Sequence, residues 1–217
     1  MRTPTSSPTP SINDTSVIEL QPQDWWRVPC QVTEHIYISG DLNTFRPEQG
    51  QTQLAEWVNL GVTDIIDVRD EWSDEGFVAE HAQGVRYHYF GTDDADNGQP
   101  DIWFQNGVSA ALEALGTPGR KLMVHCHMGV NRGPSMAFAV LLEAGYGPVE
   151  ALQMIRASRP IAGLIYAPDA LSWHHRQSGV TSAVAAREQL LLRAWMSENP
   201  VDVRWIVSRI HQAGYSS

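Results

Sequence analysis

Short runs of apolar residues alternate along this chain with segments in which apolar residues recur every three or four positions. Three runs rich in β-branched or aromatic residues are expected to form buried strands: TDIIDVRD, VRYHYFG and KLMVHC. A strand pair is expected before them in WRVPCQ and HIYISG. Helices are expected over 51–61, where Leu54, Trp57 and Val58 have helical spacing before Gly61, and over 101–116.

The order of these elements predicts an α/β fold. Strands that alternate with helices are typical of a central, mostly parallel sheet flanked by helices. Beyond residue 133 the apolar spacing is helical almost throughout, and Pro200 is expected at the start of the last helix. The helical segments expected there are 133–145, 148–159, 167–177, 185–197 and 200–214.

The chain divides into three parts. Residues 1–22 are rich in Pro, Ser and Thr and are expected to be a disordered tail, because they cannot bury enough apolar surface to offset the entropy of ordering. Residues 23–178 are expected to form one catalytic-sized domain. Residues 179–217 are expected to be a helical C-terminal extension, and no chemistry is identified in it.

Charge and cysteine content limit what the protein can bind. The formal net charge is −10 and the pI about 5.1, which argues against a broad basic face for nucleic acid or an anionic membrane. The two cysteines, Cys30 and Cys126, are too few for a disulfide framework and favour a reducing compartment. No apolar run reaches the roughly 18 residues of a membrane span, and the first residues lack the apolar core of a signal peptide. We therefore expect a soluble, cytoplasmic protein.

The stretch HCHMGVNRGPS, residues 125–135, carries the candidate chemistry. It places Cys126 at the end of a buried strand and just before a helix, where α/β folds bind ligands. Gly129 permits a tight turn, so that backbone N–H groups of the loop can surround an anion near the positive end of the helix dipole. Arg132, six residues after Cys126, can offer its planar guanidinium to two phosphate oxygens. The same features are expected to lower the pKa of the thiol from about 8.5 and to make it a thiolate at neutral pH.

This stretch resembles the HCxxGxxR signature of the cysteine-dependent protein phosphatases, with His125, Cys126, Gly129 and Arg132 in register. The chain from about 28 to 178 resembles the dual-specificity branch of that superfamily. The resemblance implies an enzyme that forms a phosphocysteine on Cys126 and then hydrolyses it with water, without metal or cofactor. The implied substrate is a phosphorylated protein, with phosphotyrosine first and phosphoserine or phosphothreonine left open.

The resemblance also implies a general acid, usually an aspartate on a separate loop, that protonates the leaving oxygen. The stretch GTDDADNGQPDIWF offers Asp93, Asp94, Asp96 and Asp101. Asp94 lies 32 residues before Cys126, near the spacing of about thirty that the resemblance implies. We assign Asp94 as the acid and keep Asp93 and Asp96 as alternatives.

The remaining residues of the stretch are assigned to substrate binding or to support of the loop. The positions expected to contact substrate are His127, Met128, Gly129, Val130 and Asn131. Those expected to support the loop are His125, by hydrogen bonding to the backbone, Gly133 and Ser135. Relatives commonly carry Ser or Thr where this chain has Gly133, and that hydroxyl helps the sulfur to leave. We therefore hypothesise that phosphocysteine accumulates in this protein.

Outside the stretch, three features are noted with more than one interpretation. Arg159 is expected to hold the loop or an additional substrate phosphate, or to form a surface salt bridge. Cys30 is expected to be a small buried hydrophobe rather than a resolving thiol. Asp67 and Asp70 are expected to form ordinary ion pairs near Arg69 at the end of a strand.

Alternative functions remain open. The same chemistry can act on a phosphoinositide or an RNA 5′ phosphate, although the loop lacks the lysines that suit highly charged substrates. A non-catalytic, phosphate-binding pseudophosphatase would be expected to have lost Cys126 or Arg132, and both are present. A sulfurtransferase fits Arg132 and the upstream acid less well. Metal binding is not expected, because His125, Cys126 and His127 make a poor ligand shell for zinc.

Overall fold

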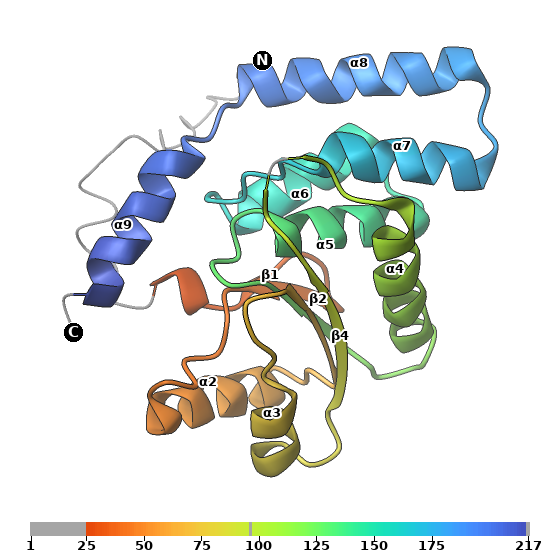
Figure 1. The fold of residues 1–217 in the computed structure, drawn as a ribbon. Coiled ribbons are helices and arrows are strands. Elements are labelled where there is room, and N and C mark those ends of the chain that lie inside the picture. The colour runs from red at the N-terminus through yellow and green to blue at the C-terminus, as the bar shows by residue number, and fades with distance from the viewer. Residues whose placement is uncertain (1–24, 96, 216–217) are drawn as a thin grey trace, which may run out of the picture.

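The computed structural model describes residues 25–95 and 97–215. Within this part of the chain, five strands form one sheet in the order β1-β2-β5-β3-β4, and helices cover both of its faces (Figure 1). The expected α/β class is therefore confirmed. The expected tail over 1–22 and the alternative acid Asp96 lie outside the described residues.

The sheet is mostly parallel, as expected. Its strands are β1 (Cys30–Gln31), β2 (Ile36–Ser39), β3 (Asp64–Arg69), β4 (Arg86–Thr92) and β5 (Leu122–His125). β5 is the central strand and pairs in parallel with β2 and β3, whereas β1 pairs antiparallel with β2. The expected first strand over 26–31 is wrong for its first half. Residues Trp25–Arg27 form a short 3₁₀ helix, η1, and pairing begins after Pro29, which has no N–H to donate to a ladder.

The helices alternate with the strands as the apolar spacing predicts. They are α2 (Pro47–Asn59), α3 (Glu75–His81), α4 (Asp101–Leu115), α5 (Arg132–Glu143), α6 (Pro148–Ser158), α7 (Ala167–Ser178), α8 (Ser182–Glu198) and α9 (Val203–Tyr215). Three expected starts are wrong, and the first of them is that of α8, which begins at Ser182 rather than at residue 185, with Thr181 accepting the N–H of Val184 at its N-terminus. α2 begins at Pro47, before residue 51, because proline suits the first turn of a helix. α9 begins at Val203 rather than Pro200, because the Asp202 side chain accepts the N–H of Trp205 at 2.9 Å.

Side chains of the central strands alternate between two cores. In β5, Leu122 and Val124 face the larger core, which α4, α5, α6 and α7 complete, while Met123 faces a smaller core with α2 and α3. In β3, Ile66 faces the larger core and Ile65 the smaller one. This two-residue period is the reason that the sheet is covered on both faces.

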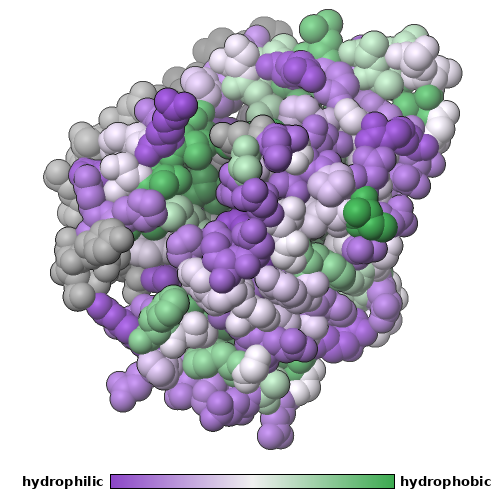
Figure 2. All heavy atoms as spheres, viewed as in Figure 1, coloured by the Kyte–Doolittle hydropathy of each residue, from purple (hydrophilic) through white to green (hydrophobic). Residues whose placement is uncertain are grey.

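The residues after 179 form α8 and α9. α8 packs along α6 and α7, and α9 turns back toward η1 at the other side of the domain (Figure 1). On the face shown in Figure 2, hydrophobic residues gather in separate patches within a largely hydrophilic surface. None of the helices in the described part of the chain is both long and apolar enough to cross a membrane.

Candidate active site

The loop between β5 and α5, residues 126–131, lies at the carboxyl end of the central strand. Gly129 adopts φ +61°, and a Cβ there would lie 2.6 Å from the carbonyl oxygen of Ser39, so both conformation and space require glycine. At Gly133, a Cβ would lie 3.2 Å from the backbone nitrogen of Cys126. The space for a side chain after the arginine is therefore tight, and an added Cβ requires a small shift of the neighbouring backbone.

The Cys126 side chain is buried under this loop, with 2% of the residue exposed. Burial raises the pKa of the thiol, while the charge of Arg132 and backbone N–H groups of the loop act in the opposite direction. The nearby Asp94 carboxylate adds to the increase. Burial thus acts against the expected thiolate, whereas Arg132 and the loop N–H groups favour it, and a thiolate at neutral pH stays a prediction.

Arg132 is held by anionic and carbonyl partners. Its Nη2 lies 2.6 Å from Glu71 Oε1, and its Nη1 lies 2.9 Å from Glu71 Oε2 and 3.0 Å from Asp70 Oδ1. Nη1 also donates to the Thr92 carbonyl at 2.9 Å. Burial alone would raise the pKa of Glu71, but hydrogen bonding to Arg132 lowers it to about 2. The planar fork assigned to phosphate is thus paired with Glu71 in this arrangement.

Asp94 lies beside the loop as the sequence spacing predicts. Its Oδ2 is 3.4 Å from Arg132 Nε, and its Oδ1 accepts from Asn131 Nδ2 at 2.6 Å and from the Tyr166 hydroxyl at 2.8 Å. Asn131 in turn accepts the N–H of Ile165 at 2.7 Å. One amide side chain therefore ties the candidate acid to the loop and to the segment before α7.

Three other loop side chains, those of His127, Met128 and Val130, contact neighbouring parts of the domain. His127 Nδ1 lies 2.8 Å from Asp41 Oδ2, and its ring makes an edge contact with Trp72, with ring centroids 5.0 Å apart. Met128 and Val130 pack in a small apolar cluster with Trp26. Their assignment to substrate binding stays a prediction that depends on their backbone N–H groups.

Two expected supports are not formed in this part of the structure. Among the described residues, neither ring nitrogen of His125 has a hydrogen-bond partner, so the expected bond to the backbone is absent. The ring lies instead against Trp57, with centroids 5.5 Å apart, and its Nε2 is 3.9 Å from Asp67 Oδ2. The buried hydroxyl of Ser135 likewise has no partner among the described residues. It does not replace the hydroxyl that Gly133 lacks.

Arg159 binds backbone carbonyls of the loop. The residue is 2% exposed, which excludes a surface salt bridge. Its Nε donates to the Gly129 carbonyl at 2.5 Å, and its Nη2 donates to the carbonyls of Met128 at 3.1 Å and Trp26 at 2.5 Å. Nη1 lies 3.4 Å from the Sγ of Cys30, which is partly exposed rather than fully buried as expected. Of the interpretations above, the loop-holding role fits these contacts.

A second arginine forms a buried ionic cluster beneath the loop. Arg69 pairs with Asp41 at 3.3 Å, with Asp67 at 3.2 Å and with Asp74, and all four side chains are at most 1% exposed. Asp67, Asp74 and His125 are close enough to hold a metal ion, but the guanidinium already bridges the two carboxylates. The expected ion pair with Asp67 is present, whereas Asp70 pairs with Arg132 instead.

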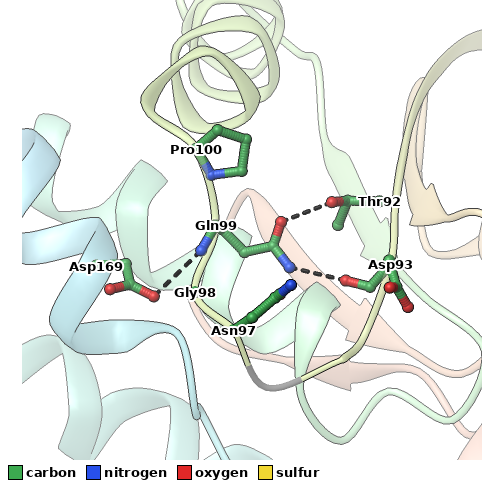
Figure 3. A pocket seen from close by; sticks show the side chains of 7 residues that line it. All are labelled: Thr92, Asp93, Asn97, Gly98, Gln99, Pro100 and Asp169. Atoms are coloured by element: carbon green, nitrogen blue, oxygen red, sulfur yellow. Dashed lines mark hydrogen bonds between the residues drawn. The ribbon is translucent and has the colours of Figure 1, made fainter.

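A polar pocket of about 520 Å³ opens beside the acid-bearing loop. Figure 3 shows Gln99 between its walls, where its side-chain amide bonds the Thr92 hydroxyl and the Asp93 carbonyl. The Gln99 backbone N–H donates to Asp169 at 3.3 Å. Through Gln99, these bonds connect the segment that carries Asp94 to α7.

Several residues of the site were not found from the sequence. Glu71 and Tyr166 contact Arg132 and Asp94 directly, and Asp41 contacts His127. The one available signal was the position of Asp70 and Glu71 just after β3, because parallel strands end at the same edge of a sheet. Tyr166 carries no such signal, since its role depends on how the segment before α7 packs.

The fold and the loop resemble those of the cysteine-dependent phosphatases. No protein-family model matches the chain. Dual specificity protein phosphatase 26 of Mus musculus is 30% identical over 106 residues, which cover 47% of this chain and 49% of that protein. Dual specificity protein phosphatase 13B of Homo sapiens is 28% identical over 110 residues, 49% of this chain and 56% of its own length. The chain thus spans about half the length of the curated relatives it matches.

Solved structures share the fold. The crystal structure of PTPMT1 aligns with a TM-score of 0.58 at 19% identity, covering 74% of this chain and 99% of that one. Human DUSP28 aligns with a TM-score of 0.56 at 16% identity, covering 69% and 95%. Together with the relatives, these structures confirm the resemblance to the dual-specificity type of cysteine phosphatase that the HCxxGxxR signature predicts.

Proposed function

We propose that this protein hydrolyses phosphate monoesters, with Cys126 as nucleophile, Arg132 as the phosphate-binding cation and Asp94 as general acid and base. One observation carries the proposal: the loop that begins at Cys126 also binds Asp94 through Asn131 and ends at Arg132, 3.4 Å from that carboxylate. A nucleophile and an anion-binding group on one small loop, with a proton donor beside it, are the parts that phosphoryl transfer through a covalent intermediate needs.

In the proposed first step the thiolate form of Cys126 attacks phosphorus, and the bond to the leaving oxygen breaks as the protonated carboxyl group of Asp94 donates its proton to that oxygen. In the second step water attacks phosphorus, Asp94 accepts its proton, and the P–S bond breaks to release orthophosphate and the thiolate. Phosphate must displace Glu71 from part of the Arg132 guanidinium, because both use the same fork. Since burial raises the pKa of the thiol, we expect activity to rise with pH along the acidic limb.

A phosphorylated protein is the proposed substrate, with phosphotyrosine first. Carboxylates surround the site at Asp70, Glu71, Asp93 and Asp94, and no loop position is a lysine. Such a surface repels a ligand with several phosphates and accepts a single phosphate flanked by neutral or basic residues. A lipid substrate remains the second candidate, because PTPMT1, which shares the fold, has also been crystallised in complex with PI(5)P.

Hydrolysis of para-nitrophenyl phosphate in EDTA across pH 5 to 8 tests the mechanism. We expect Cys126→Ser to be inactive and Asp94→Asn to lose about 10²- to 10⁴-fold in kcat together with the basic limb of the profile. Asp93→Asn is the matched control, since this neighbouring exposed carboxylate, unlike Asp94, makes no hydrogen bond or ion pair with Arg132 or Asn131 in the described part of the chain. Equal losses in both aspartate variants would remove Asp94 from its assigned role.

The substrate class is tested with the same protein on phosphotyrosine, phosphoserine and phosphothreonine peptides, a monophosphorylated phosphoinositide in vesicles and an RNA 5′ phosphate. We expect the highest kcat/KM on phosphotyrosine peptides. Binding of orthovanadate without any turnover would instead support a pseudophosphatase. The cytoplasmic location and the lack of nucleic-acid and membrane partners stay predictions.

A further inference from the structure

The C-terminal helix packs directly on the candidate phosphate-binding loop. Val130 of the loop, Trp26 of η1, and Ile206 and Ile210 of α9 form a cluster in which each residue is at most 3% exposed. This cluster is separate from the two cores on the faces of the sheet. Burial of the Val130 side chain therefore depends in part on η1 and α9, outside the two cores of the sheet.

The same helix covers the segment that holds the loop from the other side. The Gly163 N–H donates to the Val130 carbonyl at 2.6 Å. Val203, at the start of α9, lies over Gly163, where an added Cβ would be 2.6 Å from Val203 Cγ2. Both the side chain and the carbonyl of Val130 thus depend on groups that α9 packs against.

A loop binds an anion well only when its N–H groups are fixed toward one point. Without the cover of α9, Val130 would be exposed to water and the peptide groups on either side of it would gain conformational freedom. Asn131 follows Val130 directly and bonds Asp94, so the added freedom would also reach the candidate acid.

We propose that α9 is a positioning element for the phosphate-binding loop, with Ile206 and Ile210 fixing the conformation of Val130. The helix has no group that reacts, and it acts through the packing of the loop. The catalytic part of this inference rests on the proposed function, whereas the ordering of the loop does not.

Amide hydrogen exchange of the whole chain, residues 1–217, tests the ordering. We expect Ile206→Ala to speed exchange of amides in residues 127–131 about tenfold or more, while amides of β3 and β5 keep their protection. Leu190→Ala on α8 is the matched control, because this residue is 69% exposed and lies outside the cluster. Ile206→Val should restore most of the protection. Unchanged exchange in the loop of Ile206→Ala would overturn the proposal, and so would an equal increase throughout the sheet.

Kinetics then test the consequence for the site. We expect Ile206→Ala to raise KM for para-nitrophenyl phosphate and the inhibition constant of orthovanadate by about tenfold, with Ile206→Val near wild type. A loss of kcat in proportion to the unfolded fraction, with KM and vanadate inhibition unchanged, would show a merely structural role and refute the inference. If the wild type neither hydrolyses phosphate esters nor binds vanadate, the proposed function fails, while the exchange experiment still decides the role of α9.

Discussion

Replacing Arg159 by leucine tests whether a buried cation holds the loop. The change removes three hydrogen bonds of 3.1 Å or less, to the carbonyls of Gly129, Met128 and Trp26. Hydrogen bonds from a charged donor contribute about 1.5–3 kcal/mol each, and the variant also removes the desolvation cost of the guanidinium. We therefore expect the free energy of unfolding to fall by about 3–5 kcal/mol.

Urea unfolding, with the midpoint and slope measured together, is the assay for this prediction. Arg156→Leu is the matched control, three residues earlier in α6, because Arg156 donates to the Asn199 carbonyl at 3.1 Å and is only partly buried. Arg159→Lys keeps the charge but not the fork and should lie between Arg159→Leu and wild type. If Arg159→Leu were no less stable than Arg156→Leu, the loop would not depend on these bonds. The affinity of Arg159→Leu for orthovanadate should be lower than that of wild type even in the absence of urea, where the variant is folded.

Three further predictions concern charge and crowding in the site. If phosphocysteine accumulates, wild type should release a pre-steady-state burst of nitrophenol; Gly133→Ser should reduce the amplitude of this burst and Gly133→Ala should not, since only serine adds a hydroxyl. A wild type without a burst would contradict the accumulation of phosphocysteine. Glu71→Gln should move the acidic limb of kcat/KM to lower pH, because a less compensated Arg132 lowers the pKa of Cys126; an unmoved or raised limb argues otherwise. Arg69→Met should cost about 3–5 kcal/mol in urea unfolding, against about 0–1 kcal/mol for the exposed pair in Arg176→Met, and equal losses would refute the reasoning.

The sequence by itself determined the sheet and the candidate phosphate-binding loop that follows its central strand. Short apolar runs that alternate with helical segments predict a mostly parallel sheet, because the strands of such a sheet are buried on both faces. The structure has that sheet. The HCxxGxxR residues are neighbours in the chain, so their spacing alone places Cys126, Gly129 and Arg132 around one loop. Asp94 was assigned from the spacing that the resemblance implies, and it lies beside Arg132, while its role as the acid stays a prediction.

The tertiary structure decided which groups set the properties of that loop. Glu71 pairs with Arg132 across 61 residues of sequence, and Arg159 reaches Trp26 across 133. The pKa of Cys126 could not be read from its neighbours in sequence, because burial by the folded chain outweighs the local charge of Arg132. The contact of α9 with Val130 likewise depends on where the last helix turns. Such contacts follow from the packing of distant segments, for which local periodicity and motif spacing carry no information.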